Sequence, residues 1–185
     1  MTGPTAVGLT KRKLVCVDVV TLNSGRQVAI RPIAPGDRPA LSAAYDRLSD
    51  ETKYRRFMAV KPHLSGTDLR YLTDIDGARH VALVATEVDR ADQILGVARF
   101  VRLPNDPETA EFAIVVGDPY QRDGMGSALM RRLADAALSC GVKRLLGTML
   151  ADNTAAHKLT RGLAGELAHE RHFGPVDELE VELTA

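Results

Sequence analysis

A chain of 185 residues with 45% hydrophobic and 26% charged residues has the size and composition of one globular domain. Its 24 Lys and Arg residues balance 24 Asp and Glu residues, which excludes the strong positive field that holds nucleic acid or an anionic membrane surface. No apolar stretch approaches the roughly 20 residues of a membrane span. Two cysteines, Cys16 and Cys140, are too few for a disulfide framework and lack metal-ligand spacing. We therefore expect a cytoplasmic protein that binds any anion through a local group of donors.

The N-terminal half predicts a tail, a hairpin and three helices. We expect residues 1–14 to be a mobile tail and residues 15–185 to form one domain, because no repeat, low-complexity segment or linker divides the chain. The β-rich runs LVCVDVVTL and RQVAIRPI, separated by NSG, predict a hairpin. Helices are predicted after Asp37, within LSDETKYRRF, and after Ser65, which forms a capping-box pattern with Asp68.

The C-terminal half predicts a meander followed by alternating helices and strands. The runs HVALVATEV, ILGVARFVRL and AEFAIVVG are joined by short polar connections, which predicts an antiparallel meander. Apolar residues from Met125 to Cys140 recur at helical spacing and stop at Gly141, so a long amphipathic helix is predicted there. A strand KRLLGTML, a helix NTAAHKLTRGL and a half-exposed strand ELEVELT complete the chain. The predicted fold class is α/β (α+β), with helices on a mixed, mostly antiparallel sheet.

Two glycines, Gly124 and Gly126, lie in VVGDPYQRDGMGSAL, where a strand passes through a loop into the long helix. The free N–H groups at a helix N-terminus bind anions, a side chain at either glycine would block them, and Arg122 adds a cation. The Gly-Lys-Ser/Thr of a nucleoside-triphosphate loop is absent from the sequence. A dinucleotide loop needs an earlier first glycine and a small residue where Leu129 stands, and only Asp152 favours it. A tight turn without a ligand is the simpler alternative.

The same residues, taken in order, resemble the GNAT family of N-acetyltransferases. The resemblance rests on the strand ending in VVG, the loop QRDGMG, the long helix, the buried strand and the helix that opens with Asn153. It spans roughly Gln27 to Leu183. The runs RPIAPGD, LSDETKYRRF, HVALVA and AEFAIVV further resemble the catalytic domain of bacterial Pat-type protein lysine acetyltransferases. This resemblance implies a sheet in which two neighbouring strands splay apart to form an acyl-CoA cleft.

The resemblance also implies how the acyl donor, acetyl-CoA, is bound. Its pantetheine arm would pair with the strand backbone at residues 115–117, and its pyrophosphate would rest on the N–H groups of residues 122–127. Asn153 would contact the arm or act as a plain helix N-cap, and His157 would line the same site or lie on the surface. The implied cofactor-binding residues are Val115, Val116, Gly117, Gln121, Arg122, Asp123, Gly124, Met125, Gly126, Ser127, Asn153 and His157.

Glu111 is the predicted catalytic residue. It is a carboxylate inside the otherwise apolar run AEFAIVV, and it matches the catalytic glutamate of the Pat-like enzymes. A general base is useful because an amine acceptor is mostly protonated near pH 7, and a backbone N–H around Val116 would stabilise the oxyanion. A solvated strand end is the structural alternative for Glu111. Thr160 stands where many family members have a tyrosine acid, but a thiolate can leave without one.

These observations predict an acetyl-CoA-dependent N-acetyltransferase that acts on a primary amine, either a protein lysine or a small molecule. A non-catalytic acyl-CoA-binding sensor module is the alternative from another class. No nucleic-acid or membrane partner is expected. No metal is expected either, since the HERH segment with His169 and His172 lacks zinc-ligand spacing. Acceptor contacts are expected around Tyr54 and Phe57.

Overall fold

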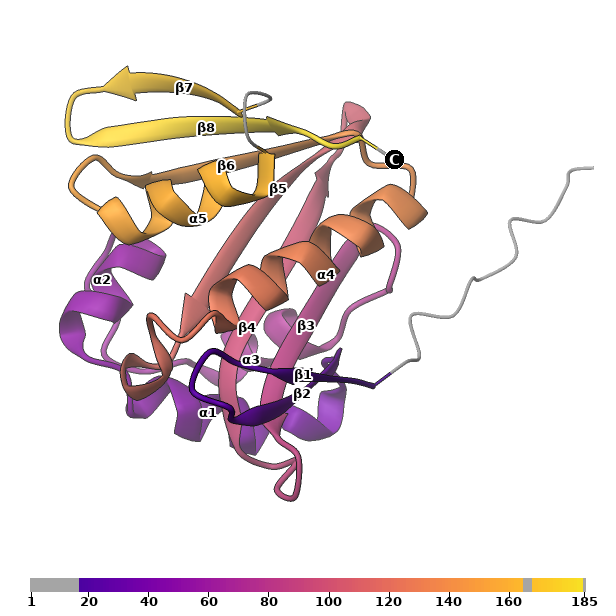
Figure 1. The fold of residues 1–185 in the computed structure, drawn as a ribbon, viewed down its shortest axis with the longest axis vertical. Coiled ribbons are helices and arrows are strands. Elements are labelled where there is room, and N and C mark those ends of the chain that lie inside the picture. The colour runs from indigo at the N-terminus through magenta and orange to yellow at the C-terminus, as the bar shows by residue number, and fades with distance from the viewer. Residues whose placement is uncertain (1–16, 165–167, 185) are drawn as a thin grey trace, which may run out of the picture.

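The computed structural model describes residues 17–164 and 168–184. Within these residues, eight strands form one sheet: β1 (Asp18–Thr21), β2 (Gln27–Pro32), β3 (His80–Glu87), β4 (Ile94–Leu103), β5 (Asp106–Val116), β6 (Arg144–Leu150), β7 (Ala168–Phe173) and β8 (Val176–Glu182). Their order is β1-β2-β3-β4-β5-β6-β8-β7 (Figure 1). Neighbours are antiparallel except β5 and β6, which are parallel. The predicted mixed, mostly antiparallel sheet, with its hairpin and meander, is confirmed.

Helices cover both faces of this sheet. The described residues form α1 (Arg38–Asp46), α2 (Asp50–Phe57), α3 (Gly66–Thr73), α4 (Met125–Ser139) and α5 (Thr154–Ala164), with short 3-10 turns at Pro35–Asp37 and Asp118–Tyr120. Figure 1 shows α4 and α5 on the face toward the viewer, and α1 and α3 behind the sheet. α2 lies against β5 and β6. The sheet is therefore buried on both faces where β3 and β4 run.

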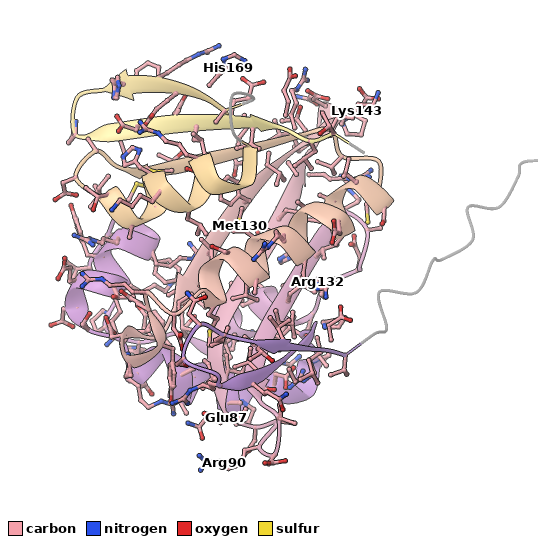
Figure 2. The ribbon with its side chains drawn as sticks, viewed as in Figure 1. Glu87, Arg90, Met130, Arg132, Lys143 and His169 are labelled. Carbon is pink, nitrogen blue, oxygen red and sulfur yellow. The ribbon has the colours of Figure 1, made fainter. Side chains whose placement is uncertain are left out.

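Two hydrophobic cores form because successive residues of a strand point to opposite faces. Val81 and Leu83 of β3 belong to the core under α4, whereas Val84 belongs to the core under α1 and α3. On α4, Met130 is fully buried on the side facing the sheet, while Arg132 lies on the outer side (Figure 2). The amphipathic helix predicted from the spacing of apolar residues thus covers one of the two cores.

Side-chain caps start α2 and α3. The hydroxyl of Ser49 accepts from the backbone N–H three residues on, at 3.2 Å, and begins α2. Ser65 and Asp68 form the predicted capping box of α3, with N–H to side-chain distances of 3.1 and 2.8 Å. Asp37 was expected to cap α1, but its carboxylate forms a bidentate pair with the guanidinium of Arg31 at 2.8 Å instead. A buried opposite charge is a stronger partner than a helix N–H group.

One strand, β7, is absent from the sequence prediction. Its residues AHERHF pair antiparallel with β8, from Ala168 opposite Val181 to Phe173 opposite Val176. β7 is an edge strand, and three of its six residues are exposed charged or histidine side chains, among them His169 (Figure 2). Edge strands carry polar residues on both faces, so alternating hydrophobicity does not reveal them.

Two further expectations concern the N-terminal residues and membrane-spanning helices. The predicted tail of residues 1–14 and Cys16 lie outside the described residues. Among the helices that the structure describes, none combines the length and apolarity that crossing a bilayer requires.

The strands β5 and β6 separate after a short paired segment. They pair only from Thr109 to Glu111 on the β5 side, in parallel register. β5 then continues to Val116 and β6 to Leu150 without pairing to each other. The two ribbons diverge beyond this point in Figure 1. This is the splayed strand pair that the sequence predicts.

The core under α4 provides a stability test. Leu129 is 0% exposed, and Leu129→Ala removes methyl groups that the packed neighbours cannot replace. We expect the free energy of unfolding to fall by about 2–5 kcal/mol, measured by urea denaturation. Val19→Ala, at a side chain that is 54% exposed, serves as the control and should change it by less than about 0.5 kcal/mol.

Candidate active site

The parting of β5 and β6 opens a cleft of about 460 Å³. Its walls are the unpaired ends of the two strands, with α5 on one side and α2 on the other. Its lining includes Glu111, Phe112 and Ile114 on β5, Gly147 and Met149 on β6, and Asn153, Leu159 and Thr160 before and within α5, and residues of α2, β7 and β8 complete it. The cleft thus exposes the open edge of β5 next to the only parallel contact of the described sheet.

An aromatic ring lies against a glycine where the two strands separate. Phe112 and Gly147 follow directly on the last paired residues of β5 and β6. A Cβ atom on Gly147 would lie 2.6 and 2.7 Å from two ring carbons of Phe112, so the ring rests on the glycine backbone. No other residue type at position 147 fits this contact without displacing the ring.

The loop before α4 presents a run of backbone donors. No N–H group from Arg122 to Ser127 has a hydrogen-bond partner within the described residues, and the first helical bond runs from Ala128 N–H to Gly124 O at 3.0 Å. Arg122 (φ 61°) and Gly124 (φ 87°) both have left-handed backbones, which turn successive N–H groups toward a common side. The positive end of α4 lies at the same place. Such an arrangement binds a phosphate group.

Contacts behind the loop hold it in this shape. The hydroxyl and backbone N–H of Ser24 donate to the Asp123 carboxylate at 2.6 and 2.7 Å, and Asn23 N–H donates to Asp123 O at 3.1 Å. The side-chain amide of Gln121 donates to Val116 O at 3.1 Å. The side chains of Asp123 and Gln121 therefore support the loop, and the loop's own N–H groups remain available.

Asp118, which sequence analysis overlooked, joins the end of β5 to α2. Its carboxylate accepts from the backbone N–H and hydroxyl of Ser49, both at 2.9 Å, and from the hydroxyl of Thr52 at 2.6 Å. It acts as an N-cap supplied from another part of the chain. A carboxylate directly after a buried strand, as in VVGDP, was the available signal.

The backbone of β5 alternates between β4 and the cleft. Gly117 N–H donates to Leu95 O at 2.8 Å, so Gly117 and, two residues back, Val115 direct their hydrogen-bonding groups toward β4. Ile114 and Val116 direct theirs toward the cleft. Of the predicted stretch 115–117, Val116 is thus the residue whose backbone faces the open space.

Glu111 lies at the fork, in the last pair that joins β5 to β6. It is in the middle of β5, so the alternative of a solvated strand end does not describe it, yet its side chain is exposed. Phe112 and Ile114 pack on the α4 side of the sheet, so Glu111 and Ala113 project from the opposite face, toward α2 and α3. The carboxylate borders both the cleft and a second cavity on that face.

Two predicted residues near α5 have structural partners. The Asn153 side-chain oxygen accepts from Ala156 N–H at 3.2 Å, which makes Asn153 an N-cap that also lines the cleft. The Thr160 hydroxyl donates to backbone carbonyls of Ala156 and His157, at 3.0 and 3.1 Å. It is therefore engaged within its own helix.

His157 does not line the cleft. Its imidazole lies between two carboxylates: Nδ1 contacts Glu170 of β7, and Nε2 is 3.2 Å from Asp177 of β8. Asp177 also binds His172 Nδ1 at 2.6 Å, which raises the pKa of His172 above 6.5. One ligand atom each from His157, Glu170 and Asp177 lie within 4.8 Å of one another. The sequence does not predict this group of three side chains, because Glu170 lies on β7, a strand that is not predicted. Its evident role is to hold α5 on the β7–β8 hairpin.

A cation lies beneath the second cavity. Arg99 on β4 is 6% exposed, donates to Leu72 O at 3.3 Å, and has its Nη1 3.3 Å from His80 Nε2. Burial lowers the pKa of His80 from 6.5 to about 4, and the neighbouring Arg99 charge adds to this effect. The His80 ring is therefore neutral at pH 7 and accepts from Arg99.

A splayed sheet, a donor-rich loop at a helix N-terminus and a carboxylate at the fork define an acyl-CoA-dependent N-acyltransferase. Comparison with known proteins agrees, because residues 43–164 match the model of the Acetyltransferase (GNAT) family. The chain belongs to this family of acetyltransferases.

Two bacterial acetyltransferases are similar to this chain in sequence. The acetyltransferase Pat of Mycolicibacterium smegmatis is 37% identical over 171 residues, covering 88% of this chain and 51% of that protein. The chain thus spans about half the length of Pat. An acetyltransferase of Pseudomonas aeruginosa is 30% identical over 164 residues, covering 88% of this chain and 86% of that protein.

Solved structures share the fold. The GNAT domain of Streptomyces lividans PAT superposes with a TM-score of 0.82 at 28% identity, covering 90% of this chain and 97% of that chain. The yncA protein of Salmonella typhimurium, solved with its cofactor acetyl-CoA, gives a TM-score of 0.66 at 20% identity, covering 85% and 94%. The predicted fold and enzyme class are confirmed.

The half-buried His80 predicts a pH dependence of stability. Because its folded-state pKa of about 4 is below the ordinary 6.5, the unfolded chain takes up the proton first. Stability is full above pH 6.5 and falls as the pH decreases toward 4. His172 titrates with the opposite sign, so the informative quantity is the difference between wild type and His80→Gln. In urea denaturation at pH 7, 6 and 5, wild type should lose more stability than the variant. Parallel losses would contradict the assignment.

Proposed function

We propose that this chain transfers the acetyl group of acetyl-CoA to a primary amine, and that the amine is a protein lysine side chain. The observation that carries the proposal is the row of N–H groups from Arg122 to Ser127 that have no partner within the described residues. At Gly126 this row lies beside Leu159, which lines the cleft that also holds Glu111. The sequence resemblance to Pat-type protein lysine acetyltransferases supports the choice of acceptor. The kinship with Pat of M. smegmatis supports it too, although the chain spans half of that protein.

The residues of the loop fit a diphosphate. Backbone donors bind it at every position from 122 to 127, so side chains are needed only to leave room. Met125 is fully buried and contributes its N–H alone, whereas Arg122 and Ser127 are exposed on the loop surface and can add a cation and a hydroxyl. A charge-neutral set of amides explains how a chain with no net charge binds a polyanion.

The edge of β5 fits the amide chain of the pantetheine arm. Ile114 and the N–H of Val116 offer backbone groups that no strand occupies, because β6 has already diverged, whereas the Val116 carbonyl accepts from the Gln121 amide. An extended amide chain pairs with such an edge as an added strand. Asn153 lines the cleft, and its cap uses only the side-chain oxygen, so the side-chain nitrogen can donate to the arm. His157 is not part of this proposed site, because its ring lies between Glu170 and Asp177.

Glu111 answers the main chemical difficulty of the reaction. A lysine amine with a pKa near 10.4 is neutral about once in 2,500 molecules at pH 7, a handicap of about 4.6 kcal/mol. Glu111 accepts the proton directly or through a water molecule, and the neutral nitrogen attacks the thioester carbonyl. The Val116 N–H donates to the carbonyl oxygen as charge develops there. The new C–N bond forms, the C–S bond breaks, and coenzyme A leaves as a thiolate. The second proton of the nitrogen then passes to that thiolate or to water, which leaves a neutral amide.

No side-chain acid is needed for this departure. None of the four tyrosines lines the cleft, and the Thr160 hydroxyl is bonded to backbone carbonyls. A thiol with a pKa near 8.5 leaves readily as its anion. A small-molecule amine is the alternative acceptor. A module that binds acyl-CoA without catalysis uses the same N–H groups and differs in having no turnover that depends on Glu111.

The role of Glu111 is tested with Glu111→Gln, which keeps the shape of the side chain and removes the base. We expect kcat for acetylation of a lysine peptide to fall by about 10²–10⁴, measured by release of free coenzyme A thiol. The dissociation constant for acetyl-CoA should change little. Glu108→Gln, on the same strand but paired with Lys143 at 2.7 Å on the surface, is the control. Equal turnover in both variants would favour the sensor module.

Donor binding is tested with Gly126→Asp. A Cβ atom at Gly126 meets only Leu159 and Val116 at 3.5 Å or more, and an acidic residue in the first turn of a helix stabilises it. The variant should therefore fold as well as wild type but repel the diphosphate, with at least about tenfold weaker acetyl-CoA binding in calorimetry. Gly36→Asp adds the same charge in open space on the surface. If both variants bind acetyl-CoA like wild type, the loop is only a turn.

A further inference from the structure

A second cavity of about 320 Å³ adjoins the cleft on the face of the sheet opposite α4. α2 and α3 form one wall, and β4 and β5 form the other. The cleft and this cavity share Arg56, Glu111, Phe112 and Ala113 in their linings, so they meet at the predicted base. An acceptor amine that reaches Glu111 from this side leaves the rest of its molecule in the cavity.

Two arginines of this cavity have no carboxylate partner within the described residues. The hydrogen-bond partners of the buried Arg99 there are neutral, the Leu72 carbonyl and the His80 ring. Arg56 forms no hydrogen bond or ion pair in the same part of the chain, and its guanidinium carbon lies 4.7 Å from the centre of the Phe57 ring. Burial lowers the pKa of both, that of Arg99 to about 10, and the charge of Arg56 contributes to the fall at Arg99. Both guanidinium groups line the same cavity, where the charge of Arg56 disfavours that of Arg99.

Arg31 shows how a carboxylate partner changes such an arginine. Arg31 is half-buried, like Arg56, but Asp37 neutralises it through two hydrogen bonds of 2.8 Å, and its pKa is raised. In the second cavity, Asp68 is the one acid besides Glu111, and Lys61 and Ser65 already bind its carboxylate, at 2.8 and 2.7 Å. Uncompensated buried cations are costly unless an anion completes the site.

The register of the sheet sets the spacing between cations and base. Arg99 pairs with Ala113 and Val101 pairs with Glu111, so Arg99 and Glu111 are diagonal neighbours on one face. Their Cβ atoms are therefore about 7–8 Å apart. A molecule with its amine at Glu111 places a group several bonds away against Arg99 and Arg56.

We propose that this cavity is a carboxylate subsite, and that the preferred acceptor carries a carboxylate several bonds from its reacting amine. The inference rests on the proposed function, because Glu111 marks the position of the reacting nitrogen. Planar guanidinium groups bind a carboxylate through paired hydrogen bonds, and a desolvated site strengthens each of them. The carboxylate can come from an acidic residue beside a lysine or from the main-chain carboxylate of a free amino acid.

Matched acceptors test the proposal. In one arm, two peptides differ only in Asp or Asn next to the reacting lysine; in the other, free lysine is compared with lysine amide. For wild type we expect kcat/KM to favour the carboxylate by roughly 10- to 100-fold in one arm, which identifies the source. Arg56→Gln should reduce the preference to near unity, and the fold should tolerate the change because Arg56 has no hydrogen bond or ion pair within the described residues to lose. Arg70→Gln, an exposed arginine on α3, is the matched control and should retain the preference.

A second readout does not require turnover. Propionate, a carboxylate without an amine, should bind the wild-type protein in calorimetry and lose binding in Arg56→Gln. Arg99→Lys, which keeps the charge but not the paired donors, should weaken it. Equal kcat/KM for every carboxylate and amide pair, together with no propionate binding, would overturn the subsite while leaving acetyl transfer intact. Failure of the proposed function itself is a separate result, seen as absent acetyl-CoA binding or absent Glu111-dependent turnover.

Discussion

The separation of β5 and β6 after three paired residues is the constraint on which the site depends. At the point of separation the ring of Phe112 lies on the backbone of Gly147. The open edge of β5, the cleft below α5 and the placement of Glu111 at the fork all follow from this separation. Unpaired strand edges are normally a liability. Here the edge is enclosed between α4 and α5, where a ligand with complementary amides can use it.

The two proposed sites recognise anions in different ways. On the α4 side, neutral backbone donors form the proposed binding surface, so no charge has to be buried when the site is empty. On the α2 and α3 side, Arg99 is buried and Arg56 is partly buried. The first arrangement suits a donor shared by a whole family, since it depends on backbone shape. The second depends on particular side chains and suits discrimination between acceptors.

Local signals in the sequence predict much of this structure. The glycine loop, the helix that follows it and the capping box at Ser65 depend on residues close in sequence, and the structure has them where they are predicted. Glu111 was noticed because a carboxylate interrupts an apolar strand. The same reasoning applied to ILGVARFVRL would have singled out Arg99, which was missed.

The remaining features depend on contacts between distant segments. β7 becomes a strand because β8 offers a partner, and its polar composition gives no alternation to read. The position of His157 between Glu170 and Asp177 follows from that pairing. Asp37 prefers Arg31 over the helix end because β2 brings the guanidinium to it. In each case a tertiary partner outweighs the local preference of the residue.

The charges around the fork also bear on catalysis. A lysine ammonium beside Arg56 and Arg99 meets like charge, which lowers its pKa and favours the neutral nucleophile, whereas the carboxylate of Glu111 favours the ammonium. A carboxylate on the acceptor would neutralise the arginines and weaken the first effect. Binding and deprotonation therefore oppose each other through the same two side chains. This opposition is small if the acceptor carboxylate stays near the arginines. The ammonium is then closer to the Glu111 carboxylate than to any other charge, and its proton moves to that carboxylate.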